Sequence, residues 1–174
     1  MEGWLRKHVI KFQTIEFPDG ISGPAYGPSS GRHNDLWSLR KSELLPALSL
    51  VQRNPQTADG IPNDVQYMVY GDGIYNNDTH LKSRHVGQQL SQRKKNENYG
   101  MSTSRECIEW SYGEIKSMFP FLLEKEKLKL ENMAVGDVYF TALLLRNCLN
   151  CTYGSKTSKY FGIDAPSLEE YMHI

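Results

Sequence analysis

The sequence contains few cysteines, no excess of either charge and no long apolar run. Its three cysteines, Cys107, Cys148 and Cys151, are too few for the disulfide framework of a small secreted protein and favour a reducing compartment. No apolar run approaches the roughly 18 residues of a membrane helix, and no signal peptide follows Met1. We therefore expect a soluble protein of the cytosol or nucleus with no membrane partner.

Charge composition also limits the function. Lysine plus arginine and aspartate plus glutamate number 20 each in the 174 residues, so no global field draws the protein to nucleic acid. A local basic surface remains possible over residues 79–95, which contain five basic residues and no acid. Its lysines and arginines, Lys82, Arg84, Arg93, Lys94 and Lys95, fit contacts to DNA phosphates and fit a solvated loop equally well, because no aromatic residue interleaves them.

The first part of the chain has the pattern of an α/β protein. "HVIKFQTIEF" alternates apolar and polar residues, "PDG" supplies a turn and "ISGPAYG" is again extended, which predicts a β-hairpin. Asn34 or Asp35 can cap a helix over residues 35–50, which we expect to break near Pro46. A short buried strand is predicted in "VQYMVYG".

Helical patterns dominate the second part. Residues 79–95 are predicted to be a basic connection, and a helix begins at about residue 101 with an apolar face through Ile108, Tyr112 and Ile115. Another helix is expected from about Lys129 or Asn132 to Cys148. The tail is loop-like, except that Ser167 and Glu170 fit the capping box of a last short helix. We predict one domain over residues 1–150 and a C-terminal tail over residues 151–174.

Two acids are candidates for chemistry. Asp72 in "YGDGIY" follows the predicted strand, at the position where α/β folds place functional residues. Glu109 lies in the helix after the basic segment, and we expect it at the edge of the buried face beside Ile108. Arg105 and Lys116 make one side of this helix cationic, which suits a phosphate-bearing partner. A glutamate at such a position also fits a solvated surface.

Paired carboxylates without a nucleophilic serine or cysteine indicate a divalent cation between them, because two close carboxylates otherwise repel each other. Mg²⁺ or Mn²⁺ fits, since such ions accept one or two carboxylates and take other ligands from substrate phosphates. Two such ions would favour the hydrolysis or transfer of a phosphodiester. The cysteine pair in "CLNC" fits packing better than metal or redox use.

Four blocks together resemble the DDE endonuclease domain of PIF/Harbinger-type transposases. They are "KFQTIEFPDGISGPAYGPSSGRHNDLW", "YGDGIY", "SRECIEWSYGEIK" and "ALLLRNCLNCTYGSKTSKYF", in the family's order over nearly the whole chain. The resemblance implies a ribonuclease H-like mixed sheet flanked by helices and catalytic acids that bind Mg²⁺ or Mn²⁺. It matches Asp72 to the second acid of the family, and Arg105, Glu109 and Lys116 to its R-x-x-x-E block with the following lysine.

The resemblance also implies a first strand carrying a first catalytic aspartate, upstream of "GWLRKHVIKFQ". We expect a chain without that strand to be a fragment or the product of a decayed gene. Asp35 matches another acid of the family's pattern and is either a substitute metal ligand or, with Asn34, a helix cap. His33 beside it is expected to be a hydrogen-bonding loop residue.

Two functions follow. The first is a metal-dependent DNA endonuclease or transposase domain, with Asp72, Glu109 and Asp35 at the metal and the basic residues on DNA. The second is a catalytically dead or domesticated domain that binds DNA or a protein partner. The resemblance further implies a Myb-like partner protein that reads the DNA sequence, because no helix-turn-helix or zinc module is present.

Overall fold

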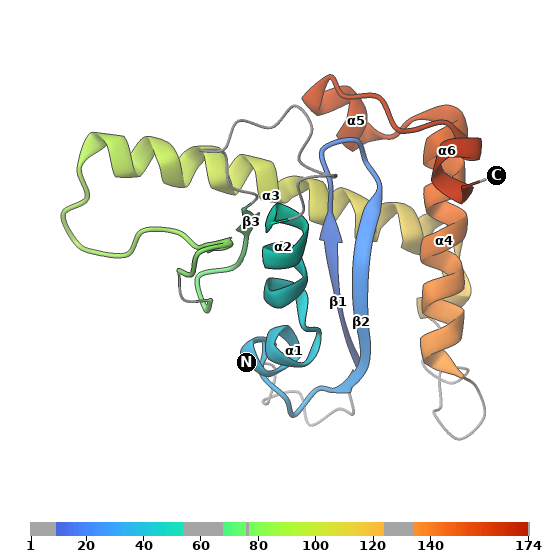
Figure 1. Cartoon of the computed structure of the whole chain (residues 1–174), viewed down its shortest axis with the longest axis horizontal. Helices are drawn as coiled ribbons and strands as arrows, with labels where there is room; N and C mark the ends of the chain where they lie inside the picture. The colour runs from blue at the N-terminus through green and yellow to red at the C-terminus, as the bar shows by residue number, and fades with distance from the viewer. Residues whose placement is uncertain (1–9, 54–67, 76, 124–133, 174) are drawn as a thin grey trace. The chain divides into compact units, whose positions relative to one another are not determined.

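The computed structural model describes residues 10–53, 68–75, 77–123 and 134–173, which form a mixed α/β structure (Figure 1). The predicted α/β class is confirmed at this level. The elements are β1 (Ile10–Glu16), β2 (Ser22–Ser30), α1 (Asp35–Lys41), α2 (Leu44–Arg53), β3 (Val69–Tyr70), β4 (Leu81–Lys82), α3 (Gln92–Met118), the 3₁₀ helix η2 (Pro120–Leu123), α4 (Val135–Tyr153), α5 (Lys156–Phe161) and α6 (Leu168–Met172). Among these helices none has the length and apolar composition needed to cross a membrane.

The chain divides into two compact units. The first unit comprises Met1–Gln13 and Ser29–Ser104, and the second comprises Thr14–Pro28 and Arg105–Ile174. The hairpin β1–β2 and the helix α3 each contribute residues to both units.

The hairpin is confirmed. β1 and β2 form a two-stranded sheet, and the connecting turn is closed by a hydrogen bond of 2.9 Å from the Phe17 amide to the Ile21 carbonyl. Gly20 has a φ of 84°, a left-handed conformation that favours glycine. The Asp19 side chain accepts a hydrogen bond of 2.9 Å from the Ile21 amide. Local turn chemistry therefore determines this part of the fold.

The predicted helix over residues 35–50 is two helices, α1 and α2, in the first unit. The break lies at Ser42 and Glu43, where Glu43 has a φ of 52°, and its predicted place near Pro46 is wrong. Pro46 is the third residue of α2, where a backbone N–H has no partner within the helix, so proline costs nothing there. Asn34 is the N-cap of α1, and its side chain accepts a hydrogen bond of 2.8 Å from the Trp37 amide.

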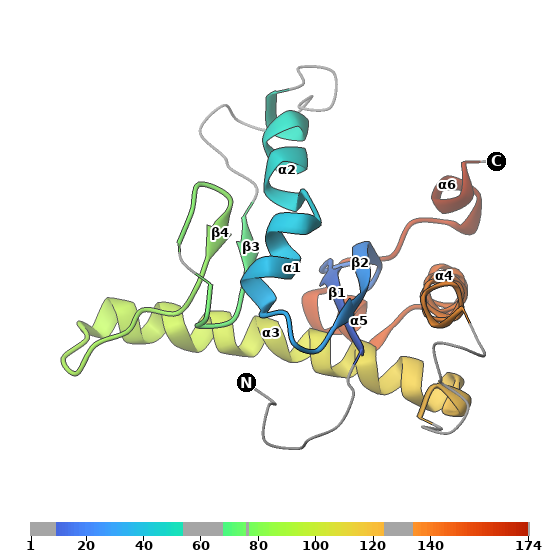
Figure 2. The ribbon, with the colours of Figure 1, turned by 90° about the horizontal axis from the view of Figure 1, so that it is seen from below.

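A second small sheet lies in the first unit. β3 and β4 run parallel, with Val69 opposite Leu81 and Tyr70 opposite Lys82, as Figure 2 shows. The strand predicted in "VQYMVYG" is present at Val69–Tyr70, but its predicted burial is wrong, because Val69 is half-buried and Tyr70 is exposed. Residues 65–67 lie outside the described part of the chain. Leu81 is buried, whereas Tyr70 is exposed.

Helix α3 begins nine residues earlier than the sequence predicts. Its first turns contain Arg93, Lys94 and Lys95, so the interpretation of residues 79–95 as one connection is wrong beyond residue 91. These turns are polar and show no apolar period that would reveal a helix. Side-chain hydrogen bonds stabilise them instead, since Asn98 bonds both the amide and the carbonyl of His85, at 2.8 and 3.0 Å.

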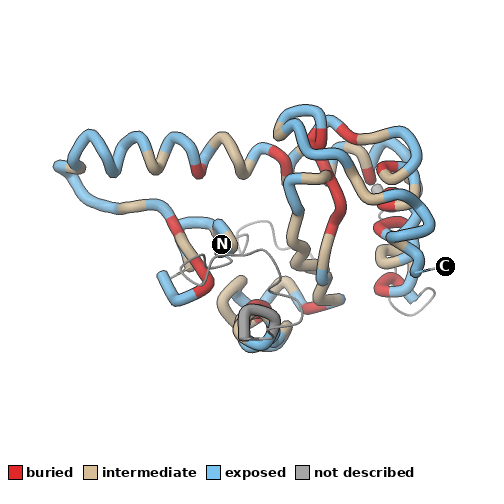
Figure 3. Tube along the Cα trace, turned by 45° about the horizontal axis from the view of Figure 1, so that its top comes forward, coloured by how far each residue is buried: buried red, intermediate tan, exposed pale blue. Residues whose placement is uncertain are grey.

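In the second unit, α4 packs beside α6 and its buried residues gather on one side (Figure 3). The helix continues to Tyr153, past its predicted end at Cys148, and its predicted start lies outside the described residues. α6 has the predicted capping box of Ser167 and Glu170. α5 was not predicted, although Ser155 and Ser158 form a second capping box at its start, because it is only six residues long.

Candidate functional site

Asp72 lies just past the end of β3, as the sequence predicts. The last backbone hydrogen bond between β3 and the strand beside it, 2.9 Å from the Gly71 amide to the Lys82 carbonyl, comes one residue before it. The Asp72 carboxylate accepts a hydrogen bond of 2.6 Å from the Gly73 amide, and the Tyr75 amide bonds the Asp72 carbonyl at 2.9 Å. Asp72 is exposed in this turn. The chain therefore presents an acid to solvent at the end of a strand.

The glycines of this turn make room for larger side chains. A Cβ atom at Gly71 would lie 2.6 Å from the Tyr75 ring, so glycine lets this ring pack against the backbone beside Asp72. A Cβ atom at Gly73 would lie 3.0 Å from Nε of Arg84. Arg84 consequently lies along the same turn as Asp72, and the structure brings these two predicted site residues together.

Glu109 lies on the exposed side of α3, in the second unit. The buried stripe of this helix runs through Cys107, Ser111 and Ile115, and positions at about 100° per residue place Glu109 on the opposite side. Its predicted place at the edge of the buried face is therefore wrong. By the same geometry, Arg105 and Lys116 share the side of α3 that carries Glu109. Lys116 is exposed and Arg105 is half-buried.

Asp35 occupies the first position of α1 and is not its cap. Its carboxylate lies 3.2 Å from the Lys11 ammonium, an ion pair within the first unit. A cation bound there would compete with this ammonium, which makes Asp35 a poorer metal ligand than an acid without a basic partner. His33 beside it stacks on the Trp37 ring at 3.7 Å between centroids.

Three other predicted DNA contacts lie in the first turn of α3. Arg93 donates a hydrogen bond of 3.0 Å to Glu97 and forms an ion pair with it. Lys94 and Lys95 are exposed. The first turn of α3 contains no acid, so these three cations share an exposed, basic helix start.

The carboxylates suit a divalent cation by their chemistry. Asp72 and Glu109 are exposed oxygen donors, the type of ligand that Mg²⁺ and Mn²⁺ prefer. Asp72 belongs to the first unit and Glu109 to the second. Within the described ranges, no three histidine, cysteine, aspartate or glutamate side chains are grouped closely enough to hold a metal ion.

The second unit contains a buried polar cluster that the sequence did not reveal. Arg146 of α4 is fully buried and lies 2.8 Å from the carboxylates of both Glu16 and Glu114. It also donates a hydrogen bond of 2.6 Å to the Ser22 hydroxyl. Burial alone would lower the pKa of Arg146, but hydrogen bonds and charge from Glu16 and Glu114 raise it. Arg146 therefore stays charged and joins β1, α3 and α4.

Two asparagines of the same helix extend this cluster to the hairpin turn. Asn147 accepts a hydrogen bond of 3.0 Å from the Ser22 amide and donates to the Ser22 carbonyl at 2.8 Å. It also donates to the Tyr171 hydroxyl at 2.9 Å, and Asn150 donates to the Gly20 carbonyl at 2.8 Å. The signal in the sequence was the polar "RN" and "N" inside the apolar run "ALLLRNCLN". Polar residues at such positions need buried partners.

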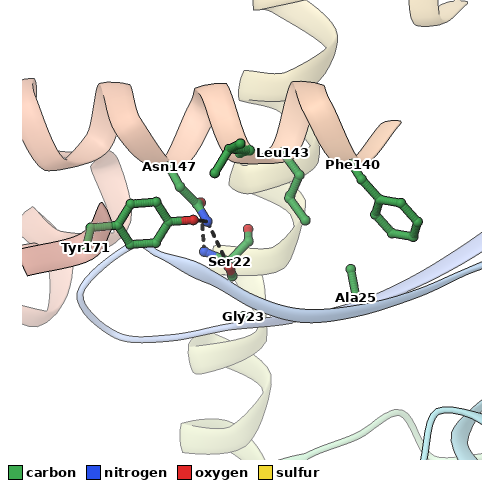
Figure 4. A pocket seen from close by; sticks show the side chains of 8 residues that line it. Ser22, Gly23, Ala25, Phe140, Leu143, Asn147 and Tyr171 are labelled. Atoms are coloured by element: carbon green, nitrogen blue, oxygen red, sulfur yellow. Dashed lines mark hydrogen bonds between the residues drawn. The ribbon is translucent and has the colours of Figure 1, made fainter. Parts of the chain in front are cut away.

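A cavity of about 310 Å³ opens beside these asparagines (Figure 4). Phe140, Leu143 and Leu144 give it apolar walls, while Ser22, Asn147 and Tyr171 supply a polar side. The polar groups bond one another there, as the dashed lines in Figure 4 indicate. No predicted site residue lines this cavity.

All three cysteines are free thiols. Cys107 is buried, and burial raises the pKa of its thiol to about 11. Burial and then the neighbouring Cys148 raise the pKa of Cys151. The thiols of Cys107 and Cys151 are therefore protonated at neutral pH, and a packing role for the "CLNC" pair stays a prediction.

Comparison with known protein families matches residues 2–147 to the DDE superfamily endonuclease family. The match includes Asp72, Glu109, Arg105 and Lys116, and also the start of the buried cluster on α4. No curated protein and no solved structure gives a match. Because the family match covers most of the 174 residues, the chain belongs to the DDE superfamily endonuclease family.

Proposed function

We propose that this chain is a metal-dependent DNA endonuclease domain of the PIF/Harbinger transposase type, with a ribonuclease H-like arrangement of its sheet and helices. The family match carries this proposal, because its range, residues 2–147, includes both acid-containing blocks. The substrate is a phosphodiester of duplex DNA, and the reaction is its hydrolysis or transfer. Nuclear localisation and a Myb-like partner that reads the DNA sequence are parts of the same proposal.

The acids have the first role in this proposal. Asp72 and Glu109 hold Mg²⁺ or Mn²⁺ through exposed carboxylate oxygens. When bound, a pair of such ions supplies the charge that favours attack on a phosphodiester and loss of its leaving oxygen. The turn at Gly73 fixes the orientation of the Asp72 carboxylate through its amide hydrogen bond. Asp35 is the third acid of the proposed set, provided that Lys11 releases it.

The basic residues position the DNA backbone. Arg105 and Lys116 lie on the same side of α3 as Glu109, so their charges attract the phosphates next to that carboxylate. Arg84 lies along the turn that holds Asp72 and supplies a guanidinium there. Arg93, Lys94 and Lys95 add phosphate contacts at the exposed start of α3.

Nicking of supercoiled DNA in the presence of Mg²⁺ or Mn²⁺ tests this function. We expect Asp72→Asn and Glu109→Gln each to lower the nicking rate by on the order of 100-fold, because a neutral side chain holds a divalent cation poorly. Asp78→Asn is the matched control for Asp72, since Asp78 is also exposed and also accepts a hydrogen bond of 2.6 Å from the next amide. Glu106→Gln, on an exposed position of the same helix, is the control for Glu109.

The controls decide the interpretation. Equal losses in Asp78→Asn and Glu106→Gln would contradict the assignment of Asp72 and Glu109. A parent chain that unfolds cooperatively but never nicks DNA would contradict the enzymatic proposal and leave the alternative of a binding domain. Electrophoretic binding of duplex DNA by the same preparations would then measure that alternative directly.

A further inference from the structure

The end of α4 and the helix α5 that follows it combine aromatic and basic residues. "YGSKTSKYF", residues 153–161, contains three aromatic residues, two lysines and no acid. The basic segment at residues 79–95 has no aromatic residue, so the two stretches differ in what they can bind. Interleaved aromatic and basic residues are typical of surfaces that bind single-stranded nucleic acid.

Within the second unit, two residues of α5, Lys156 and Tyr160, lie against Trp110 of α3. The Lys156 ammonium lies 4.0 Å from the centroid of the Trp110 ring, a cation–π contact. The Tyr160 ring packs edge-to-face with Trp110 at 5.4 Å between centroids. Phe161 packs edge-to-face with Tyr160 at 4.9 Å. Three aromatic rings and an ammonium from two helices therefore form one cluster.

Part of the cluster is accessible, although Trp110 and Phe161 are half-buried. Tyr160 is 50% exposed, and Lys156 and Lys159 are both exposed. Lys159 and Tyr160 follow Lys156 by three and four positions in α5, so both lie on the same side of the helix as Lys156. The opposite side is fixed, because Thr157 and Ser158 are buried. The helix thus presents a ring and two ammonium groups from a firmly held backbone.

The capping box makes this presentation rigid. The Ser158 amide donates to the Ser155 hydroxyl at 2.9 Å, and the Ser155 amide donates to the Ser158 hydroxyl at 2.9 Å. Both serines are buried, so their bonds hold the first turn of α5 in place. A preorganised aromatic surface loses little conformational entropy when a ligand stacks on it.

We propose that Trp110, Lys156, Lys159 and Tyr160 form a binding site for unpaired nucleotides of DNA. The rings offer stacking surfaces for bases, and the ammonium groups reach the phosphates on either side. Bases inside a duplex hide their faces in the helical stack, so this chemistry selects unpaired bases. The inference rests on the proposed function for the choice of DNA, because cutting a duplex exposes unpaired nucleotides.

The cation–π contact fits the same role. Lys156 has three N–H donors, and its contact with the Trp110 ring leaves donors for a phosphate oxygen. The ammonium is held near the ring instead of moving freely in water. A nucleotide that stacks on Tyr160 would therefore meet a positive charge that is held against the neighbouring Trp110 ring.

Fluorescence anisotropy with the full chain tests the site without metal, in a buffer that contains EDTA. The probes are a labelled oligothymidine, an abasic strand of equal length and charge, and a duplex. We expect the parent chain to bind oligothymidine about tenfold more tightly than the abasic strand, because one stacked base adds about that factor. Tyr160→Leu keeps apolar bulk without an aromatic ring and should abolish this difference, whereas Tyr160→Phe should retain it.

The lysines give a second, independent signature. Lys156→Ala with Lys159→Ala should weaken binding of oligothymidine and of the abasic strand equally, and lower the salt dependence of both. Tyr99→Ala and Lys41→Ala are matched controls, since Tyr99 is 76% exposed and Lys41 is exposed on α1. These controls should leave the preference for oligothymidine over the abasic strand unchanged.

Equal affinity of the parent chain for oligothymidine and the abasic strand would overturn the proposal, as would a preference that survives Tyr160→Leu. Equal affinity for the two strands would leave a protein segment as the ligand of these rings. A preference for unpaired bases in a chain that does not nick DNA would contradict the proposed function and support this site. Nicking by a chain that shows no such preference would support the proposed function and contradict this site.

Discussion

Each unit contains a group of ion pairs, and the two groups are built in opposite ways. In the second unit, one cation, Arg146, is shared by Glu16 and Glu114 and is fully buried. In the first unit, one acid, Glu97, is shared by Lys82, His85 and Arg93 near the surface. The distances are similar, since Arg146 lies 2.8 Å from Glu16 in the buried group and Arg93 lies 3.0 Å from Glu97 in the group near the surface.

The difference lies in the solvent around these charges. Water and salt screen an exposed pair, so such pairs contribute little to folding. When a buried charge loses its partner, no water is present to solvate that charge. Removal of the partner therefore destabilises the folded chain strongly. The ion pairs of Arg146 contribute little net stability, but removal of Arg146 is expected to destabilise its unit strongly. Removal of the Glu97 charge is expected to change stability little. Three substitutions, taken in order of expected effect, test this contrast.

Arg146→Met should destabilise the chain most, by about 3–5 kcal/mol, because it leaves the carboxylate of Glu16 buried without a cation. Urea unfolding at pH 7, followed by far-UV circular dichroism, measures the change in unfolding free energy. Arg40→Met, on an exposed position of α1, is the matched control and should change it by less than about 0.5 kcal/mol. A loss below about 1 kcal/mol in Arg146→Met would contradict the contrast between the units.

Asn147→Leu should cost about 2 kcal/mol, because the buried amide and carbonyl of Ser22 both lose their partner. The same urea titration measures it. Asn96→Leu is the control, since Asn96 is exposed on α3 and bonds only the neighbouring Gln92 side chain among the described contacts. Equal effects of the two substitutions would show that burial does not determine the contribution of these amides.

Glu97→Gln should have the smallest effect. The hydrogen bond with His85, followed by the one with Arg93, lowers the pKa of Glu97 below 4.5. An acid with a lowered pKa stabilises the folded chain above its unfolded pKa, and this contribution disappears as the pH falls through the folded pKa. The parent and the variant should therefore differ slightly above pH 4.5 and converge in acid, as thermal unfolding across pH can measure. A difference that grows in acid would contradict this sign.

Much of the local structure could be predicted from the sequence. The hairpin, a helix cap at Asn34 or Asp35, the Ser167 capping box and a strand before Asp72 each depend on neighbouring residues. Each is confirmed, with Asn34 as the cap. The start of α3 was missed because its polar first turns have no apolar period. The break at Glu43 was misplaced because proline, the usual helix breaker, is harmless in a first turn.

The candidate site was predictable in part. The position of Asp72 follows from a strand and two glycines in one short stretch. The exposed side of Glu109 was not predictable, because the apolar period indicates a face through Ile108 and Tyr112. Packing buries the stripe through Cys107 and Ser111 instead, where Ser111 lies 3.4 Å from the Ser22 hydroxyl of the hairpin. The metal, the DNA and the roles of Asp35 and the basic residues stay predictions.

The sequence by itself determined the family, the two acid-containing blocks and the helix caps, because these depend on residue types within a few positions of one another. The tertiary structure alone decided the partners of Arg146, which lies 130 positions from Glu16, and the meeting of Lys156 with Trp110. Contacts over such separations depend on how whole elements pack. The sequence does not distinguish a buried arginine from a surface arginine, because only tertiary packing removes water from the guanidinium.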